Sequence, residues 1–250
     1  MNPYIQNLNR IEFLITYACT GHCKHCSEGG HAMRGEHIDG SAAVLAVEKI
    51  CGAFAIDSLM TFGGEPLLYY EEVCKIHAAA QKMKIPKRQI ITNGFFSRDK
   101  EQIKAAAVKL AQSGVNQILL SVDAFHQETI PLEPVKTFAE AVKGAGIPLK
   151  VHPAWLVDKN DPNPYNRRTG EILEEFEQME IAVSDGNVIF PSGNALKYLG
   201  EYFEADRKYT NPYTENPEDI RSICFEPNGD ILGGNIYQRD ILDVLENYAP

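Results

Sequence analysis

Apolar and polar positions along the chain follow two alternating patterns. Short runs rich in Ile, Leu, Val and Phe are each followed by a segment with apolar residues at helical spacing. We expect strands near residues 11–17, 57–62, 88–92, 117–122, 149–156 and 187–190. We expect helices near residues 42–54, 69–83, 98–112, 134–144 and 170–179. Strands alternating with helices indicate a parallel sheet with crossover helices. Six units are too few for a closed eight-stranded barrel, so the predicted fold class is α/β, a partial (β/α)6 barrel open on one side.

Local signals mark where these helices begin and end. Ser41 and Ser97 are expected N-caps, and Gly114 falls just past the third helix. The strand ends also carry the polar and glycine-rich segments considered below. In barrels of this kind, functional residues gather at the carboxyl ends of the strands.

The last fifty residues differ in composition from the rest of the chain. Residues 198–216 are rich in Tyr, Asn, Pro and acidic residues, and residues 220–237 predict a hairpin that turns at 227–230. An amphipathic helix is expected over 239–248. We therefore divide the chain into a barrel, residues 1–195, and a small C-terminal hairpin-plus-helix extension, residues 196–250.

Three cysteines follow the first expected strand. Cys19, Cys23 and Cys26 have the spacing C-x3-C-x2-C, and no fourth cysteine lies nearby. Iron–sulfur clusters are normally held by four thiolates, so a local triplet favours a cluster whose fourth iron is left for another ligand. The alternative is a structural zinc site, because Cys3His can close a tetrahedral site and His22, His25 and His31 lie close in sequence.

Three further motifs follow the next strands in order. Gly63, Gly64, Glu65 and Pro66 follow the second strand, and the glycines let backbone approach a ligand closely while Glu65 offers a carboxylate. Thr92-Asn93-Gly94 closes the third strand, and Ser121-Val122-Asp123 closes the fourth. With the cysteine triplet, these motifs resemble those of the radical S-adenosylmethionine (SAM) superfamily over roughly residues 10–190.

The resemblance implies a radical SAM barrel with a [4Fe–4S] cluster and SAM as cofactors. It implies that Cys19, Cys23 and Cys26 ligate three irons and that SAM chelates the fourth. It further implies that Gly63, Gly64, Glu65 and Pro66 bind the methionine amino group, and that Asn93, Ser121 and Asp123 contact the ribose or methionine part. His25 stands where this family usually has an aromatic residue near the adenine. The implied reaction is reduction by an external flavodoxin- or ferredoxin-type donor, cleavage of SAM to a 5′-deoxyadenosyl radical, and abstraction of a substrate hydrogen.

Other residues are candidates with an ordinary alternative beside each. Arg168, with Arg167, lies in an expected loop over 157–169 and is either a carboxylate clamp or an exposed cation. His126 is either an acid or base for the substrate or a structural imidazole. Cys224 resembles the start of the SPASM/twitch-like extension of many peptide-modifying members, in a shortened, cysteine-poor form. We expect no auxiliary cluster there and a free thiol, with hydrogen-atom donor or cluster ligand as the alternative roles.

Composition bears on partners. The formal net charge is −10, and the densest charge run, residues 171–180, is acidic, so nucleic-acid binding is not expected. No apolar run reaches 18 residues and no signal peptide is evident, so we expect a cytoplasmic protein with no membrane partner. The favoured substrate is a peptide. Since only about ten residues precede the first strand, leader recognition is expected to come from elsewhere. The alternatives are a small-molecule enzyme of the carboxy-deazaguanine synthase kind, or a non-catalytic iron–sulfur or zinc protein.

Overall fold

A seven-stranded parallel sheet forms the centre of the molecule in the computed structural model, which describes residues 2–29, 35–204, 209, 211 and 214–250. Its strand order is β7-β5-β4-β3-β2-β1-β9, and every neighbouring pair is parallel. The strands are β1 (Arg10–Leu14), β2 (Ser58–Phe62), β3 (Lys87–Thr92), β4 (Gln117–Leu120), β5 (Leu149–Val151), β7 (Ala182–Val183) and β9 (Ser222–Phe225). The partial α/β barrel expected from the sequence is confirmed, with one strand more than six.

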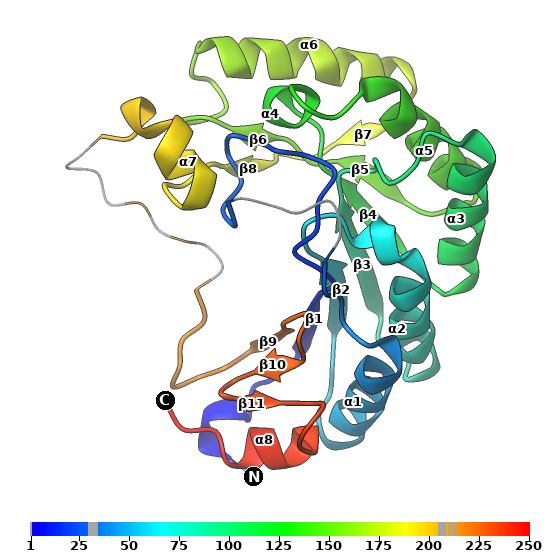
Figure 1. Ribbon diagram of the computed structural model, residues 1–250, viewed down its shortest axis with the longest axis vertical. Coiled ribbons are helices and arrows are strands. Elements are labelled where there is room, and N and C mark those ends of the chain that lie inside the picture. Colours follow the sequence, from blue (N-terminus) through cyan, green and yellow to red (C-terminus); the bar gives the residue numbers. More distant parts are fainter. Residues whose placement is uncertain (1, 30–34, 205–208, 210, 212–213) are drawn as a thin grey trace.

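Helices cover one face of this curved sheet, and the loop after β1 lies on the other side (Figure 1). The outer helices are α1 (Gly40–Ala53), α2 (Tyr70–Lys82), α3 (Lys100–Gln112), α5 (Leu132–Gly144) and α6 (Pro164–Gln178). Shorter helical segments are η1 (Pro3–Ile5), η2 (Pro66–Tyr69), α4 (Ala124–Gln127), α7 (Gly193–Tyr198), η3 (Gly200–Tyr202) and α8 (Ile241–Glu246). No helix among the described residues is long and apolar enough to cross a bilayer.

Alternation along each strand explains the two faces of the sheet. In β1, Ile11 and Phe13 are fully buried against the helices, whereas Arg10 and Glu12 point to the opposite, concave face. Strand register then places Glu12 beside Met60 of β2 and beside Cys224 of β9. The concave face is therefore more polar than the packed face.

Helix starts are fixed by aspartates and not by the serines expected from the sequence. The Asp39 carboxylate accepts hydrogen bonds from two backbone amides at the start of α1, and Asp99 does the same for α3. Ser41 and Ser97 are therefore wrong as N-caps, because an aspartate two residues away takes the free amides in each case. Gly114 does follow α3, with φ +83°.

The later strands differ from the prediction. The expected strand over 149–156 is divided into β5 and β6 (Ala154–Trp155), and the sixth barrel strand is β7, not residues 187–190. Residues 187–188 form β8 (Asn187–Val188), which pairs with β6 in a separate two-stranded sheet. A two-residue barrel strand such as β7 offers too short a pattern for recognition by periodicity.

The C-terminal segment completes the barrel sheet. The hairpin expected over 220–237 is wrong in its pairing, because β9 pairs with β1, while only β10 (Asp230–Ile231) and β11 (Gly234–Asn235) form an antiparallel pair. The rings of Phe13 and Phe225 stack at 4.6 Å, so β9 shares the main core. Residues 220–246 are thus packed into the same core as the barrel.

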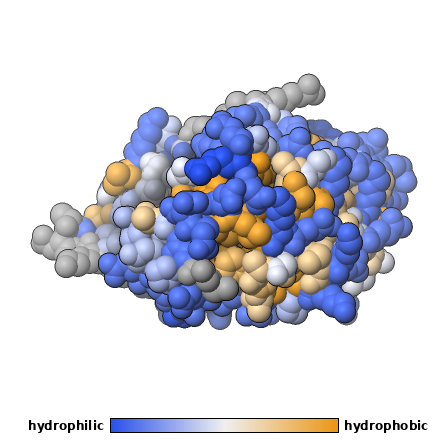
Figure 2. Space-filling model, turned by 90° about the horizontal axis from the view of Figure 1, so that it is seen from below, coloured by the Kyte–Doolittle hydropathy of each residue, from blue (hydrophilic) through white to orange (hydrophobic). Residues whose placement is uncertain are grey.

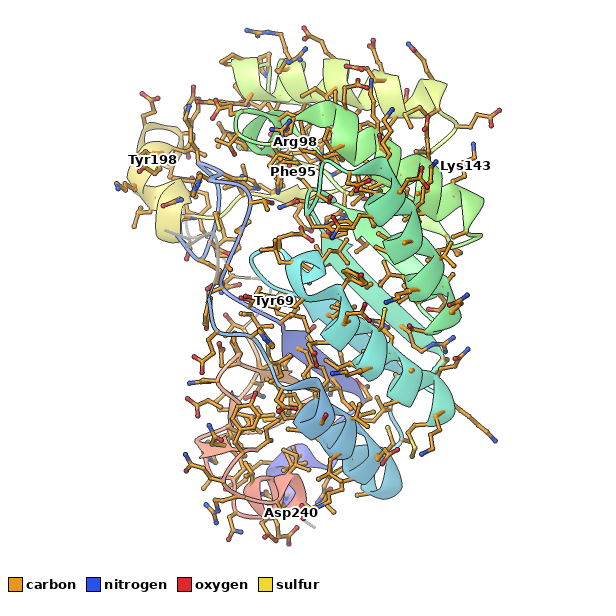
Figure 3. All side chains as sticks on the ribbon, turned by 45° about the vertical axis from the view of Figure 1, so that its right-hand side comes forward. Tyr69, Phe95, Arg98, Lys143, Tyr198 and Asp240 are labelled. Atoms are coloured by element: carbon orange, nitrogen blue, oxygen red, sulfur yellow. The ribbon has the colours of Figure 1, made fainter. Side chains whose placement is uncertain are left out.

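Helix α8 closes the end of the molecule where both termini lie. Its N-cap Asp240 lies at the lower end of the molecule in Figure 3 and pairs with Lys49 of α1. The face seen from below shows apolar residues gathered at its centre with hydrophilic residues around them (Figure 2). The buried Asn2 side chain donates to the carbonyls of Leu245 and Tyr248, at 3.0 and 2.6 Å. These contacts hold the two ends of the chain together.

We expect Phe225→Ala to lower the free energy of unfolding by about 3–5 kcal/mol, because it removes a fully buried ring from the stack with Phe13. Urea denaturation followed by circular dichroism measures the change. Leu242→Ala, on an exposed position of α8, is the control and should change stability by less than about 0.5 kcal/mol. Equal effects of the two substitutions would contradict the packing of β9 in the core.

Candidate functional site

A cavity of about 520 Å³ lies at the carboxyl ends of the barrel strands. Residues from the ends of β1, β2, β3 and β4 line it, together with residues from β8 and β9. Cys19, Cys23 and Cys26 all line this cavity, and each carries its sulfur outside any disulfide. The structure thus brings the predicted cysteine triplet to one wall of one cavity.

The loop that carries the cysteines (residues 19–29, the cysteine loop) is held by a segment far along the chain. Asn194 donates its side-chain amide to the carbonyls of Cys23 (3.2 Å) and Gly29 (3.3 Å), and its backbone amide to the carbonyl of Cys26 (2.8 Å). Gly193 has φ +49°, and a Cβ there would lie 2.2 Å from the Ser27 carbonyl oxygen. Sequence reasoning missed this clamp, since nothing local links residues 193–194 to the cysteines.

A second contact holds the loop from the side of α4. The backbone amide of His22 donates to the Thr129 hydroxyl at 3.0 Å, and Lys24 pairs with Glu128 at 3.0 Å. The two sets of contacts fix the loop at both Cys23 and Cys26. Because the loop is already ordered, less conformational entropy is lost when a metal group binds to its cysteines.

The two glycines after β2 pack against backbone. A Cβ on Gly63 would lie 2.6 Å from the Thr16 carbonyl oxygen, and one on Gly64 would lie 2.2 Å from that of Ala18. The amide of Gly64 donates to Thr16, and the amide of Glu65 donates to Ala18. Both glycines also line the cavity. Glycine is therefore needed at both positions because the backbone packs against the segment that leads into the cysteine loop. The sequence predicts close approach to a ligand as the reason.

Glu65 is a buried carboxylate engaged with the protein itself. It accepts hydrogen bonds from the Leu67 amide, the Thr92 hydroxyl and the Asn93 amide, at 2.7–2.9 Å. Burial raises its pKa to about 7 although these three donors act in the opposite direction. The side chain ties the end of β2 to the end of β3. Pro66 is likewise buried and opens η2.

Asn93 and Ser121, which the resemblance implies contact SAM, both line the cavity. The Asn93 side-chain amide lies 3.6 Å from the Cys19 sulfur, and the Gly21 amide lies 3.4 Å from the same sulfur. Donors placed at a ligating sulfur are among the features that set the potential of an iron–sulfur cluster. Two hydrogen-bond donors therefore face the Cys19 sulfur from the cavity wall and from the cysteine loop.

Asp123 is fully buried and has four hydrogen-bond donors around it. It accepts from the amides of Phe125 and His126 at the start of α4, from the Ala154 amide, and from His126 Nδ1 at 2.9 Å. Burial opposes ionisation of this carboxyl, but the charge of His126 and the hydrogen bonds from that residue hold its pKa well below the usual range. Asp123 thus organises its surroundings, and its carboxylate has little capacity left for direct contact with a ligand.

Two histidines stand beside the cysteines. The His25 ring lies 4.7 Å from the His126 ring and 5.0 Å from that of Phe125. Burial lowers the pKa of His25 to about 4, so its ring is neutral at physiological pH. Burial also lowers the pKa of His126, but the Asp123 carboxylate outweighs it and the net direction is upward. Of the other histidines considered for zinc, His22 is exposed, and His31 lies outside the described residues.

The donor set fits an iron–sulfur cluster. Burial raises the pKa of Cys19 to about 12 and raises that of Cys23 well above its ordinary value, with neighbouring acidic groups and cysteines adding to the effect. In the metal-free chain both are thiols, and metal binding must displace their protons. Three thiols on one fixed loop, with donors aimed at one sulfur, match the requirements of a three-cysteine cluster site.

The β1–β9 edge forms the other wall of the cavity. Glu12, Cys224 and Glu226 line it, and Tyr17 donates its hydroxyl to Glu226. Burial first, and then the carboxylates of Glu12 and Glu226, raise the pKa of Cys224 to about 12. The described residues that line the cavity include four carboxylates, those of Glu12, Glu28, Asp123 and Glu226, and no Lys or Arg.

Arg168 lies away from this cavity. The loop expected over 157–169 is confirmed only as far as Asn163 and is wrong beyond it, because α6 begins at Pro164 with Asn163 as its N-cap. Arg168 lies on that helix, 58% exposed, and pairs with Glu171 at 2.7 Å. A role for Arg168 in holding a carboxylate within the cavity is therefore not expected.

Comparisons with known proteins agree with this arrangement. Residues 13–155 match the family model described as the Radical SAM superfamily. The probable GTP 3′,8-cyclase of Saccharolobus solfataricus is 25% identical over 217 residues, which cover 79% of this chain and 65% of that protein. That of Methanocaldococcus jannaschii is 24% identical over 123 residues, which cover 49% of this chain and 39% of that protein. The chain thus spans less than two thirds of the length of these relatives.

Solved structures share the fold at low identity. SuiB of Streptococcus suis bound to S-adenosylmethionine superposes with a TM-score of 0.58 and 14% identity, over 96% of this chain and 66% of that one. Native anSMEcpe with bound AdoMet gives the same TM-score and identity, over 96% of this chain and 80% of that one. The similarity therefore extends into the C-terminal segment.

We expect Asn194→Ala to weaken retention of iron, because it removes the two side-chain bonds that hold the cysteine loop at Cys23 and Gly29. After anaerobic reconstitution, loss of iron to a chelator should be about 10-fold faster than in the parent protein. Leu196→Ala, at a position of α7 that is 60% exposed, is the control and should match the parent. Identical rates for all three proteins would contradict the clamp.

Proposed function

The chain belongs to the radical SAM superfamily, and we propose that Cys19, Cys23 and Cys26 hold its [4Fe–4S] cluster and that the adjoining cavity binds SAM. When bound and reduced by an external one-electron donor of flavodoxin or ferredoxin type, these cofactors supply a 5′-deoxyadenosyl radical for hydrogen abstraction. The observation that carries the proposal is the meeting of all three cysteines at one cavity with Gly63, Asn93 and Ser121.

The chain's own residues hold, orient and shield the cofactors. The clamp at Asn194 and the contact at Thr129 fix the three sulfur atoms relative to the sheet. Gly63, Gly64, Asn93 and Ser121 form the wall where we place SAM. Glu65 and Asp123 support this wall from behind, since their carboxylates already accept bonds from the protein. Such preorganisation fixes the reacting groups before the substrate arrives.

We further propose a substrate without phosphate groups. A nucleoside triphosphate needs cations near its phosphates, whereas the described lining of this cavity has carboxylates and no Lys or Arg. The relatives described above are probable GTP 3′,8-cyclases, so this chain is expected to differ from them in substrate.

A peptide is the favoured substrate. Support comes from the resemblance of the segment from Cys224 onward to the shortened extension of peptide-modifying enzymes, and from the position of β9 in the cavity wall. Glu226 on that wall favours a peptide that carries a Lys or Arg side chain near the attacked carbon, whereas Glu12 is already paired with Arg10. A small cationic metabolite is the second candidate, favoured by the small-molecule names of the curated relatives.

Anaerobic reconstitution with iron, sulfide, reductant and SAM tests the cofactor proposal. The parent protein should form 5′-deoxyadenosine, and Cys26→Ala should lose formation by at least about 1000-fold, since the cluster then lacks one of three ligands. Cys51→Ala, a half-buried helix cysteine away from the cavity, should retain both iron and product. Formation of 5′-deoxyadenosine by Cys26→Ala at the parent rate would refute the ligand assignment.

Deuterium-labelled substrates test the substrate proposal. A Lys-containing peptide deuterated at its carbons should pass deuterium to 5′-deoxyadenosine, and deuterated GTP should not. Glu226→Gln should raise KM for that peptide by about 10-fold, because one charge-assisted contact is lost. Glu140→Gln, exposed on α5, is the matched control and should leave KM unchanged. Transfer from GTP, or equal KM values for the two variants, would count against the proposal.

A further inference from the structure

A second donor set shares one cysteine with the triplet. One ligand atom from each of Cys23, His25 and His126 lies within 4.8 Å of the other two. One thiol and two imidazoles are typical ligands of Zn²⁺, whose sites with three protein ligands keep an open fourth position. The residues come from the cysteine loop and from α4, which the contact between His22 and Thr129 holds together.

His126 is oriented as a metal ligand would be. Its Nδ1 lies 2.9 Å from the Asp123 carboxylate, which only accepts hydrogen bonds, so Nδ1 carries the proton and Nε2 keeps its lone pair. A carboxylate that orients a ligating imidazole in this way is a recurrent second-shell partner of zinc. Asp123 is itself fixed by three backbone amides, so the imidazole has a defined direction.

The ring of His25 gives a second, independent observation that points to a metal ligand. Its Nδ1 is buried and has no hydrogen-bond partner among the described residues. A buried polar atom without a partner costs about 1–3 kcal/mol. Coordination of a metal ion through Nδ1 would remove that cost.

We infer that the cluster-free chain binds one Zn²⁺ through Cys23, His25 and His126, and that this ion and the [4Fe–4S] cluster exclude each other because both need Cys23. Binding converts the Cys23 thiol to a thiolate with release of its proton, and an imidazolium at His126 also releases its Nε2 proton. The exclusion rests on the cluster assignment proposed above, whereas zinc binding by this trio does not. Zinc is in this sense an inhibitor of cluster assembly that acts on the apoprotein.

Co²⁺ titration of anaerobic apoprotein tests the site directly, because Co²⁺ in a zinc site gives visible absorption bands and a thiolate charge-transfer band. We expect one Co²⁺ for each chain, displaced by one Zn²⁺. His25→Phe keeps a ring against Phe125 and should weaken Co²⁺ binding by at least about 100-fold, and Asp123→Asn by about 10–100-fold. His22→Phe, on the same loop but exposed, is the matched control and should bind like the parent.

Two cysteine variants and one histidine variant separate the zinc site from the cluster site. Cys26→Ala should bind Co²⁺ and fail to assemble a cluster, whereas Cys23→Ala should lose both. His25→Phe should assemble a cluster with parent iron content, and added Zn²⁺ should no longer block that assembly. Circular dichroism of each apoprotein checks the fold.

The outcomes are distinguishable. Co²⁺ binding that survives His25→Phe and requires Cys26 would overturn the inference and assign the ion to the three cysteines alone. Absence of stoichiometric Co²⁺ binding in the folded parent protein would also overturn it. Failure of the reconstituted parent protein to form 5′-deoxyadenosine, with the Co²⁺ pattern intact, would reject the proposed function and leave the zinc site standing.

Discussion

Direct backbone contact between the end of β2 and the strand that leads into the cysteine loop is the constraint on which the site depends. The amides of Gly64 and Glu65 continue the hydrogen bonding between β1 and β2 past the strand ends, onto the carbonyls of Thr16 and Ala18. Only glycine allows this approach, since a Cβ at position 64 would lie 2.2 Å from the Ala18 oxygen. Cys19 follows at once, so its position is set by the sheet.

The sequence predicts the parts of this arrangement that arise within a strand and its following turn. β1 to β4 lie close to their expected ranges, and Cys19, Gly63, Asn93 and Ser121 meet at one cavity. The parts that depend on distant partners were not predictable. Asn194 has no local signal for its contact with Cys23, 171 residues earlier. The sequence predicts a loop over 157–169 because the Pro and Asn residues at the start of α6 are also common in loops.

The two carboxylates of the predicted motifs show why residue type alone does not assign a role. Glu65 and Asp123 were both expected to contact the cofactor, yet both accept their hydrogen bonds from the protein. A buried carboxylate surrounded by amide donors can join two loops strongly, because bonds to a charged acceptor exceed those to a neutral one. The acidic character of the cavity comes instead from Glu12, Glu28 and Glu226, which belong to no motif.

The closure of the cysteine loop by residues 192–194 has a consequence for biosynthesis. On the ribosome, Cys19, Cys23 and Cys26 emerge long before Asn194, and β9, which borders β1, emerges later still. The nascent barrel therefore carries its three cysteines without their clamp throughout most of translation. The site that we propose for the cluster is complete only after residues 192–194 have packed against the cysteine loop.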